Sequence, residues 1–270
     1  MGSNDISPPH VPSYVVPVSN ALLQAGGGLW TITYILMARQ SFKDRTYGMP
    51  FFALALNFAW EIVYALYVAE MPLERFVFTV WLLLDCAMVY GLLTSGKEEW
   101  NHAPSMKKYL GTIFWITTIW CTVGHWAFAK WWLDNDVGQK EGKFYMGRVG
   151  PDTTELGFWS ALICQVNLSA ASLVMLLVRQ HTGGVSWKIW GSRMLGSVFG
   201  LYGNYGWEWW MWREAHEYFM SPFAVFMWVT CLVCDLVYPF FFARIRRTEK
   251  VLLDGRKAPG SIEIEGKKSR

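Results

Sequence analysis

Residues 41–64 read SFKDRTYGMPFFALALNFAWEIVY, and this stretch decides how the rest of the chain is interpreted. After a basic turn and Pro50 it is apolar except for Asn57 and Glu61. Residues four positions apart share one face of a helix, so these two side chains are expected to point the same way. Glu61 falls roughly 16 Å along a helix beginning at Pro50, near the middle of a hydrocarbon layer about 30 Å thick. An ionised carboxylate there costs on the order of 3 kcal/mol or more, which makes Glu61 a candidate functional residue.

The composition of the whole chain favours a membrane protein. Of its 270 residues 53% are apolar and only 17% are charged, whereas soluble domains are about 25% charged. Apolar runs of about twenty residues recur without period-two alternation, and such runs predict helices rather than membrane strands. We therefore predict an all-α polytopic membrane protein, a bundle of seven transmembrane helices. The expected spans are residues 18–39, 50–69, 76–94, 109–129, 156–178, 187–206 and 222–243.

The distribution of basic residues predicts the orientation. One transmembrane domain at 18–243 is expected between an N-terminal tail at 1–17, without a cleavable signal peptide, and a basic tail at 244–270. Eighteen of the 24 Lys and Arg residues fall after the first, third and fifth helices or in the C-terminal tail. By the positive-inside rule the N-terminus is lumenal and the C-terminus cytosolic. The net charge of +3 is therefore a topology signal and gives no reason to expect nucleic acid as a partner.

Four other features of the chain lead to expectations. The first seventeen residues are expected to be a tail without contacts, and the longest loop, about 130–155, a solvated loop rather than a lid. Glu208 stands in a tryptophan-rich interfacial belt, where it need not be buried. Lys267 and Lys268 resemble the dilysine retrieval signal of endoplasmic-reticulum membrane proteins, which predicts that compartment.

Two more acids fall within predicted helices. Asp235 lies about thirteen residues past Pro222, again near mid-membrane, and Tyr238 follows it one turn later. Asp85 lies about ten residues into the third helix. It is either a third buried functional acid or a residue that only bonds a neighbouring helix, and the sequence leaves both readings open.

Acids buried among aromatic rings suit proton transfer combined with stabilisation of a cation. Desolvation favours the neutral form of a carboxyl group, so Glu61 or Asp235 could serve as a general acid. The face of an aromatic ring attracts a cation by about 0.5 to 2 kcal/mol, and a dry pocket keeps water from a carbocation. These are the needs of a proton-initiated polyene cyclisation. A transporter or a structural bundle with paired acids accounts for the same residues equally well.

The run SFKDRTYGM followed by NFAWEIVYAL resembles the small membrane-integral terpene cyclases of fungal meroterpenoid and indole-diterpene biosynthesis, the paxilline-cyclase-like family. The loop sequence KEEWNHAP, the Cys164–Gln165 pair and the late acid of the last helix extend the resemblance over most of the chain. It implies a redox-neutral cyclisation, without metal or cofactor, of a plain or epoxidised polyprenyl chain on an aromatic or indole head group. An upstream prenyltransferase and epoxidase would supply this substrate. The long loop at 130–155 looks like an extension and leaves the head group open.

The resemblance implies two catalytic acids, which fall on Glu61 and Asp235. Which of them donates the first proton stays open. We expect Asn57 to bond Glu61 and the rings of Trp60 and Tyr64 to contact the cation. Asp85, Trp228 and Tyr238 complete the expected substrate-binding set. The alternative function is that of a small seven-helix transporter that uses its buried acids for proton or substrate coupling.

Overall fold

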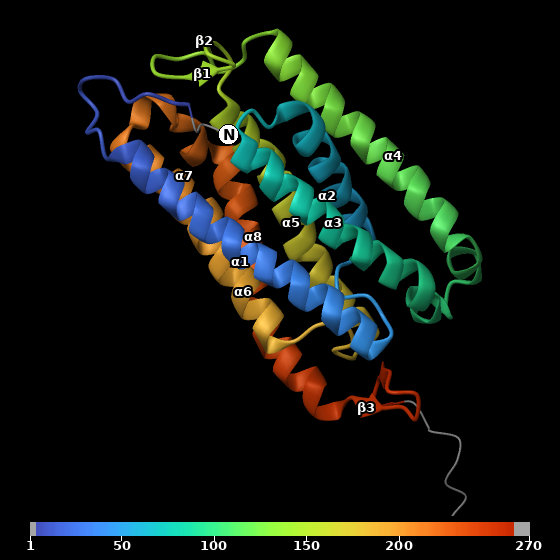
Figure 1. Cartoon of the computed structure of the whole chain (residues 1–270). Helices are drawn as coiled ribbons and strands as arrows, with labels where there is room; N and C mark the ends of the chain where they lie inside the picture. The colour runs from blue at the N-terminus through green and yellow to red at the C-terminus, as the bar shows by residue number, and fades with distance from the viewer. Residues whose placement is uncertain (1–3, 262–270) are drawn as a thin grey trace, which may run out of the picture.

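The computed structural model describes residues 4–261, which form a bundle of long helices lying side by side (Figure 1). Two π-helical segments continue α-helices: η1 (Tyr64–Val68) extends α2, and η3 (Val198–Gly203) joins α6 to α7 in one rod. The α-helices are α1 (Val15–Asp44), α2 (Phe51–Val63), α3 (Pro72–Ser95), α4 (Pro104–Asp134), α5 (Thr153–Arg179), α6 (Trp187–Ser197), α7 (Asn204–Met211) and α8 (Pro222–Thr248). The described residues thus contain one helical rod at each of the seven predicted spans, and the all-helical class is confirmed.

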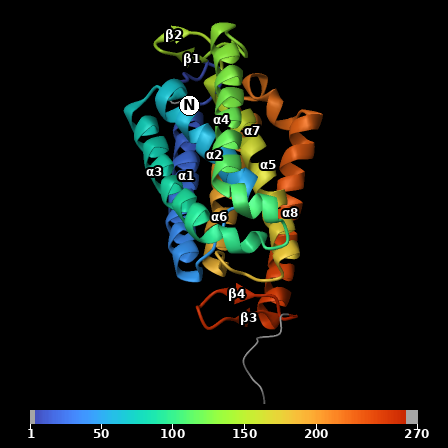
Figure 2. The ribbon, with the colours of Figure 1, turned by 90° about the vertical axis from the view of Figure 1, so that its right-hand side faces the viewer.

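Short elements occupy the ends of the bundle. One antiparallel hairpin, β1 (Phe144–Tyr145) with β2 (Arg148–Val149), lies between α4 and α5. A second, β3 (Lys250–Val251) with β4 (Lys257–Ala258), follows α8 at the opposite end of the molecule (Figure 2). Three 3-10 helices complete the connections: η2 (Gly96–Trp100), η4 (Arg213–Ala215) and η5 (Glu217–Met220).

Five of the described rods are long and apolar enough to cross a membrane. They are α1, α2 with η1, α3 with η2, α5 and α8. The α4 helix and the α6–α7 rod run beside them (Figure 1) and are not among these five. The number of crossings and their orientation therefore stay predictions.

Proline and capping side chains set where the helices begin. Pro72, Pro104 and Pro222 stand in the first turns of α3, α4 and α8, where a missing N–H is tolerated. The side chain of Asp152 accepts a hydrogen bond from the backbone N–H of Glu155 and so caps α5. These local signals set the residue at which each helix begins, and so how its apolar face lines up with those of the neighbouring helices.

Glycines allow α1 to approach the α6–α7 rod closely. Gly26 of α1 faces Gly200 of η3, and a methyl group on Gly26 would overlap the backbone of Gly200. Gly196 of α6 faces the ring of Trp30 in the same interface. Small residues therefore serve close helix packing at this interface.

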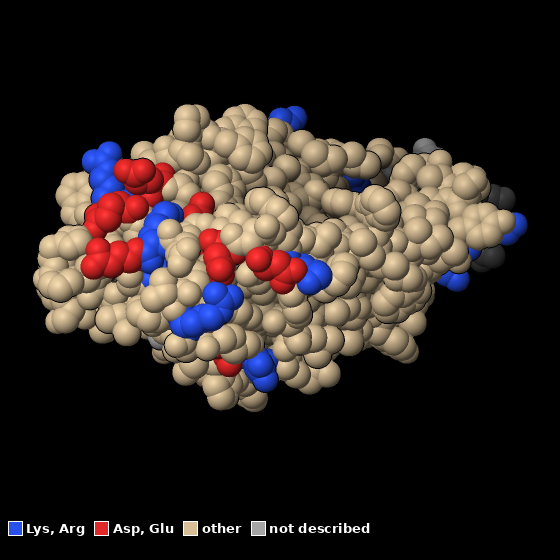
Figure 3. All heavy atoms as spheres, turned by 90° about the horizontal axis from the view of Figure 1, so that it is seen from above, with Lys and Arg blue, Asp and Glu red and all other residues tan. Residues whose placement is uncertain are grey.

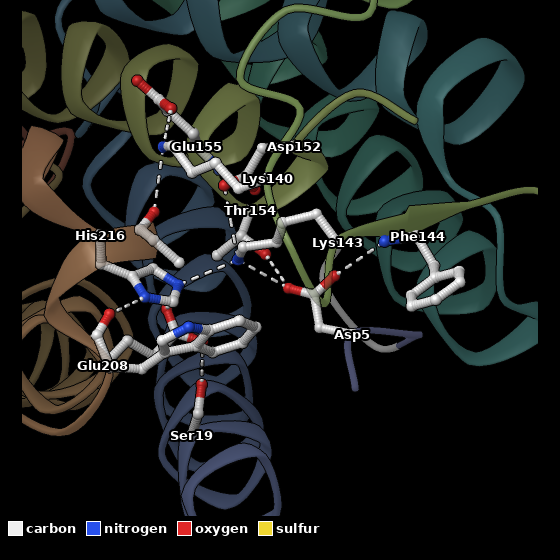
Figure 4. A network of polar contacts seen from close by, with 12 residues as sticks. Asp5, Ser19, Lys140, Lys143, Phe144, Asp152, Thr154, Glu155, Glu208 and His216 are labelled. Carbon is white, nitrogen blue, oxygen red and sulfur yellow. Dashed lines mark hydrogen bonds and ion pairs between the residues drawn. The ribbon is translucent and has the colours of Figure 1, made fainter. Parts of the chain in front are cut away.

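A buried charge cluster ties the N-terminal end of the bundle together (Figure 4). Lys143, in the loop between α4 and α5, has no exposed surface. Its Nζ lies 2.8 Å from Asp5 Oδ2, 3.4 Å from Asp152 Oδ2 and 3.0 Å from His216 Nε2. We call these four residues and Glu208, whose Oε2 lies 3.5 Å from His216 Nε2, the Lys143 cluster.

The Lys143 cluster overturns three expectations. The N-terminal tail is attached, because Asp5 binds both Lys143 and Thr154. The loop between α4 and α5 is not a plain solvated loop, because a wholly buried lysine sits within it. Glu208 is buried and accepts a hydrogen bond from Ser19 Oγ at 2.7 Å. Sequence reasoning missed the cluster because its members lie far apart along the chain.

Charged side chains on the outside gather in one zone of the molecule seen from above, and broad areas around them carry no charge (Figure 3). Many large apolar residues are exposed, among them Phe76, Trp120, Phe226 and Phe240. Large exposed apolar areas are unfavourable in water but stable against lipid, so this surface fits a membrane-embedded bundle.

Replacing Lys143 by Met should destabilise the protein by about 3 to 5 kcal/mol, because Asp5 and Asp152 would be left buried without their cation. The measurement is thermal or denaturant unfolding of the detergent-solubilised protein. Lys130→Met is the matched control, since Lys130 is exposed and forms only a surface pair with Asp134. Equal small effects of both substitutions would show that the Lys143 cluster does not hold this end of the bundle.

Stability should also fall in acid through His216. Burial, and then the charge of Lys143, lower the pKa of His216 well below 6.5. The unfolded chain therefore binds a proton that the folded chain excludes, and stability is lost as the pH falls below about 6.5. Melting curves between pH 7.5 and 5 should show a steeper decline for the wild type than for His216→Gln. Parallel declines would contradict this assignment.

Candidate active site

A pocket of about 460 Å³ lies between α1, α2, α3, α5 and the α6–α7 rod. Its wall is mainly apolar and aromatic. The shallow end carries Asn20 and Gln24 of α1 with Leu73 of α3, and the deep end carries Tyr34 and Gln165. Because Asn20 and Tyr34 are fourteen residues apart on one helix, the pocket extends for about 21 Å along the axis of α1.

Four stacked rings form one wall of this pocket. The rings of Tyr34 and Trp81 lie 6.1 Å apart and nearly parallel, and those of Trp81 and Trp60 lie 6.3 Å apart. Phe78 meets Trp60 edge-on at 5.0 Å. Trp81 Nε1 also donates a hydrogen bond to Thr31 Oγ1 at 2.8 Å, which fixes its ring. The pocket therefore has an aromatic wall, and aromatic rings can attract a bound cation.

The first acidic centre lies directly behind Tyr34. Glu61 of α2 and Asp85 of α3 are wholly buried and interact with each other, and Glu61 also interacts with Tyr34. No described residue forms a hydrogen bond of normal geometry or an ion pair with either carboxyl group. Two carboxylates side by side without a cation repel each other strongly, so this arrangement is stable only if the pair holds a proton.

The second acidic centre is fully paired. Asp235 of α8 lies 2.5 Å from Arg193 Nη2 of α6 through its Oδ1. Its Oδ2 accepts hydrogen bonds from Ser169 Oγ at 2.9 Å and Gln165 Nε2 at 3.4 Å. Arg193 donates a further bond to Ser172 Oγ at 3.0 Å. This environment stabilises an ionised carboxylate, and Gln165 connects it to the pocket wall.

The structure brings together part of the predicted site. Asn57 and Trp60 line the pocket, while Glu61 and Asp85 lie behind it. Tyr64 supports Trp60 from behind, with ring centroids 5.0 Å apart. Its hydroxyl lies 2.6 Å from Ser160 Oγ.

Two predicted substrate contacts lie elsewhere, and one predicted bond is absent. Trp228 stacks on Phe219, and Tyr238 packs on Phe242 beside Arg193, so neither lines this pocket. Their part in substrate binding stays a prediction. The expected bond from Asn57 to Glu61 is wrong, because Asn57 Nδ2 instead donates to Met49 Sδ at 3.5 Å.

Sequence reasoning missed Tyr34 and Arg193. Arg193 counted only as a basic residue near the membrane surface, although an arginine six residues inside a predicted span needs a buried acid as partner. Tyr34 lies seven residues after Gly27 and therefore on nearly the same face of α1. This spacing is the signal that could have identified Tyr34 as a residue of that face. Within residues 4–261, no cluster of three or more His, Cys, Asp or Glu has the geometry of a metal site, and metal independence stays a prediction.

Comparison with known proteins identifies the family. Residues 3–248 match the model of the Pyr4-like transmembrane terpene cyclases, and the chain belongs to this family. It is 43% identical over 258 residues to terpene cyclase ascF of Acremonium egyptiacum, covering 96% of this chain and 93% of the relative. Terpene cyclase paxB of Penicillium paxilli is 34% identical over 239 residues, covering 88% and 90%. No solved structure matches the chain significantly.

Family membership confirms the resemblance recognised in residues 41–64. It also decides between the two functions that the residues alone left open. The chain is a transmembrane terpene cyclase, and the transporter reading is not supported.

The Arg193–Asp235 pair gives a prediction about stability. Arg193→Met should destabilise the bundle by about 3 to 5 kcal/mol, because a buried carboxylate loses its cation. The double variant Arg193→Met/Asp235→Leu should recover most of this loss, since no buried charge is left unpaired. Unfolding of the single and the double variant in detergent measures both changes in stability. Additive losses in the double variant would mean that the two side chains do not depend on each other.

Proposed function

We propose that this terpene cyclase begins its reaction by protonating the terminal epoxide or alkene of a polyprenyl chain carried by an aromatic or indole head group. The observation that supports this most directly is the Glu61–Asp85 pair, placed behind an aromatic pocket and free of any described cation. A carboxyl group that holds its proton inside an apolar protein is suited to general acid catalysis.

The proton leaves from the Glu61–Asp85 pair through Tyr34. Tyr34 lines the pocket and interacts with Glu61, so its hydroxyl can pass a proton to the substrate and take one from Glu61 in return. Asp235 is a poorer donor, because Arg193 holds it in the ionised form. Its part is to fix Gln165 in the pocket wall.

The positive charge then moves along the chain as each alkene attacks the neighbouring cationic carbon. The aromatic wall, which contains Tyr34, Trp81 and Trp60, stabilises the cation at successive positions, with about 0.5 to 2 kcal/mol for each desolvated cation–ring contact. A final proton leaves to a carboxylate or water, which restores the charge balance. Substrate and product are isomers, so no electron donor or acceptor is required. Metal independence belongs to this proposal.

The proposed setting is the endoplasmic-reticulum membrane, with seven crossings, a lumenal N-terminus and a cytosolic C-terminus. Contacts among Asp5, Lys143 and His216 support part of this topology, because they require the N-terminal tail and two alternate loops to share one side. Lys267 and Lys268, the basis of the compartment prediction, lie outside the described residues. A prenyltransferase and an epoxidase are the upstream reaction classes that would supply such a substrate.

Glu61→Gln should lower product formation by about 10² to 10⁴-fold, because the proton source is removed. Tyr34→Phe should also lower product formation. Microsomes carrying each variant are incubated with epoxidised farnesyl- and geranylgeranyl-aromatic compounds, and isomers of unchanged mass are followed by mass spectrometry and NMR. Glu141→Gln, an exposed glutamate of the loop after α4, is the control. Wild-type turnover that persists in Glu61→Gln would remove Glu61 from the mechanism.

A further inference from the structure

Gly27 lies at the centre of the α1 face that lines the pocket. The other lining residues of this face, such as Asn20, Thr31 and Tyr34, recur on either side of it at helical spacing. Gly27 is seven residues from both Asn20 and Tyr34, or about 10 Å along the helix axis in each direction. It therefore stands halfway between the shallow mouth and the acidic deep end.

Neither packing nor backbone conformation requires glycine at this position. A Cβ atom on Gly27 would meet only Cζ2 of Trp81, at 3.7 Å, which is an ordinary van der Waals contact. Gly26, the preceding residue, is different, because its Cβ would overlap Gly200. Glycine inside a helix costs roughly 0.5 to 1 kcal/mol relative to alanine. The helix bears this cost at Gly27 without any gain in helix packing, and the space stays open to the pocket.

The ring beside Gly27, that of Trp81, is held in place. Trp81 is fixed by its hydrogen bond to Thr31 and by stacking between Tyr34 and Trp60. A larger side chain at position 27 would therefore not push this ring aside, and would take its volume from the ligand. In a close-packed protein wall, even one added methylene group reduces the space left for whatever the wall encloses.

We propose that Gly27 determines how bulky a prenyl chain the pocket accepts. The inference rests on the proposed function, in which the reacting end of the chain lies at Tyr34. The rest of the chain must then pass Gly27 on its way to the mouth at Asn20 and Gln24. The missing side chain widens the pocket where a longer chain has to fold, so Gly27 is a specificity-determining residue.

The test compares Gly27→Ala and Gly27→Leu with the wild type on geranyl, farnesyl and geranylgeranyl substrates that share one head group. We define selectivity as the ratio of kcat/KM for the longest chain that is turned over to kcat/KM for the next shorter chain. This ratio should fall about 10-fold or more in the leucine variant. The alanine variant should shift the ratio in the same direction by less. If the leucine variant does not fold, the alanine variant carries the test.

Gly124→Leu in α4 is the matched control, because a Cβ there meets nothing within 4 Å and Gly124 does not line the pocket. Its selectivity should equal that of the wild type. Wild-type turnover with unchanged chain-length selectivity in both Gly27 variants would overturn this inference alone. A correctly folded wild type that converts none of the substrates would overturn the proposed function and this inference with it.

Discussion

A carboxyl group inside an apolar bundle must either keep a proton or lie beside a cation, and this constraint organises the molecule. Asp235 meets it through Arg193, at 2.5 Å, together with Ser169 and Gln165. Glu61 meets it in the other way, next to a second carboxyl group and with no described cation. The same bundle thus holds two acids in different environments, and both lie next to residues that line the pocket. Acid chemistry needs this kind of separation by environment.

The helices are arranged to keep the pocket dry and rigid. The stacked rings of Tyr34, Trp81 and Trp60 come from three different helices, so the pocket wall is also the interface that holds α1, α3 and α2 together. The contact between Gly26 and Gly200 brings α1 against the α6–α7 rod on the other side. In the proposed function, substrate recognition and fold stability use the same side chains, and substitutions in this wall change both.

The sequence was sufficient for the helices and for the burial of Glu61 and Asp235, because hydrophobic length and helical spacing are local properties of the chain. It was insufficient wherever two distant segments meet. Arg193 looked like a surface anchor until its partner on α8 was known. Lys143 looked like part of a solvated loop, although its partners lie 138 and 73 residues away. Asp85 could be called buried, but only tertiary structure places it beside Glu61.

The Lys143 cluster has a consequence for how the protein is made. Asp5 leaves the ribosome early, Lys143 follows 138 residues later, and His216 another 73 residues after that. The cluster can close only after the segments carrying all three have been synthesised and brought to the same end of the bundle. Its closure is therefore a late step of folding, because Asp5 meets Lys143 and His216 only when most of the described chain has been made. A bundle with one helix inserted the wrong way round would leave Lys143 without Asp5. The end of the bundle that carries the Lys143 cluster would then stay exposed to quality-control systems.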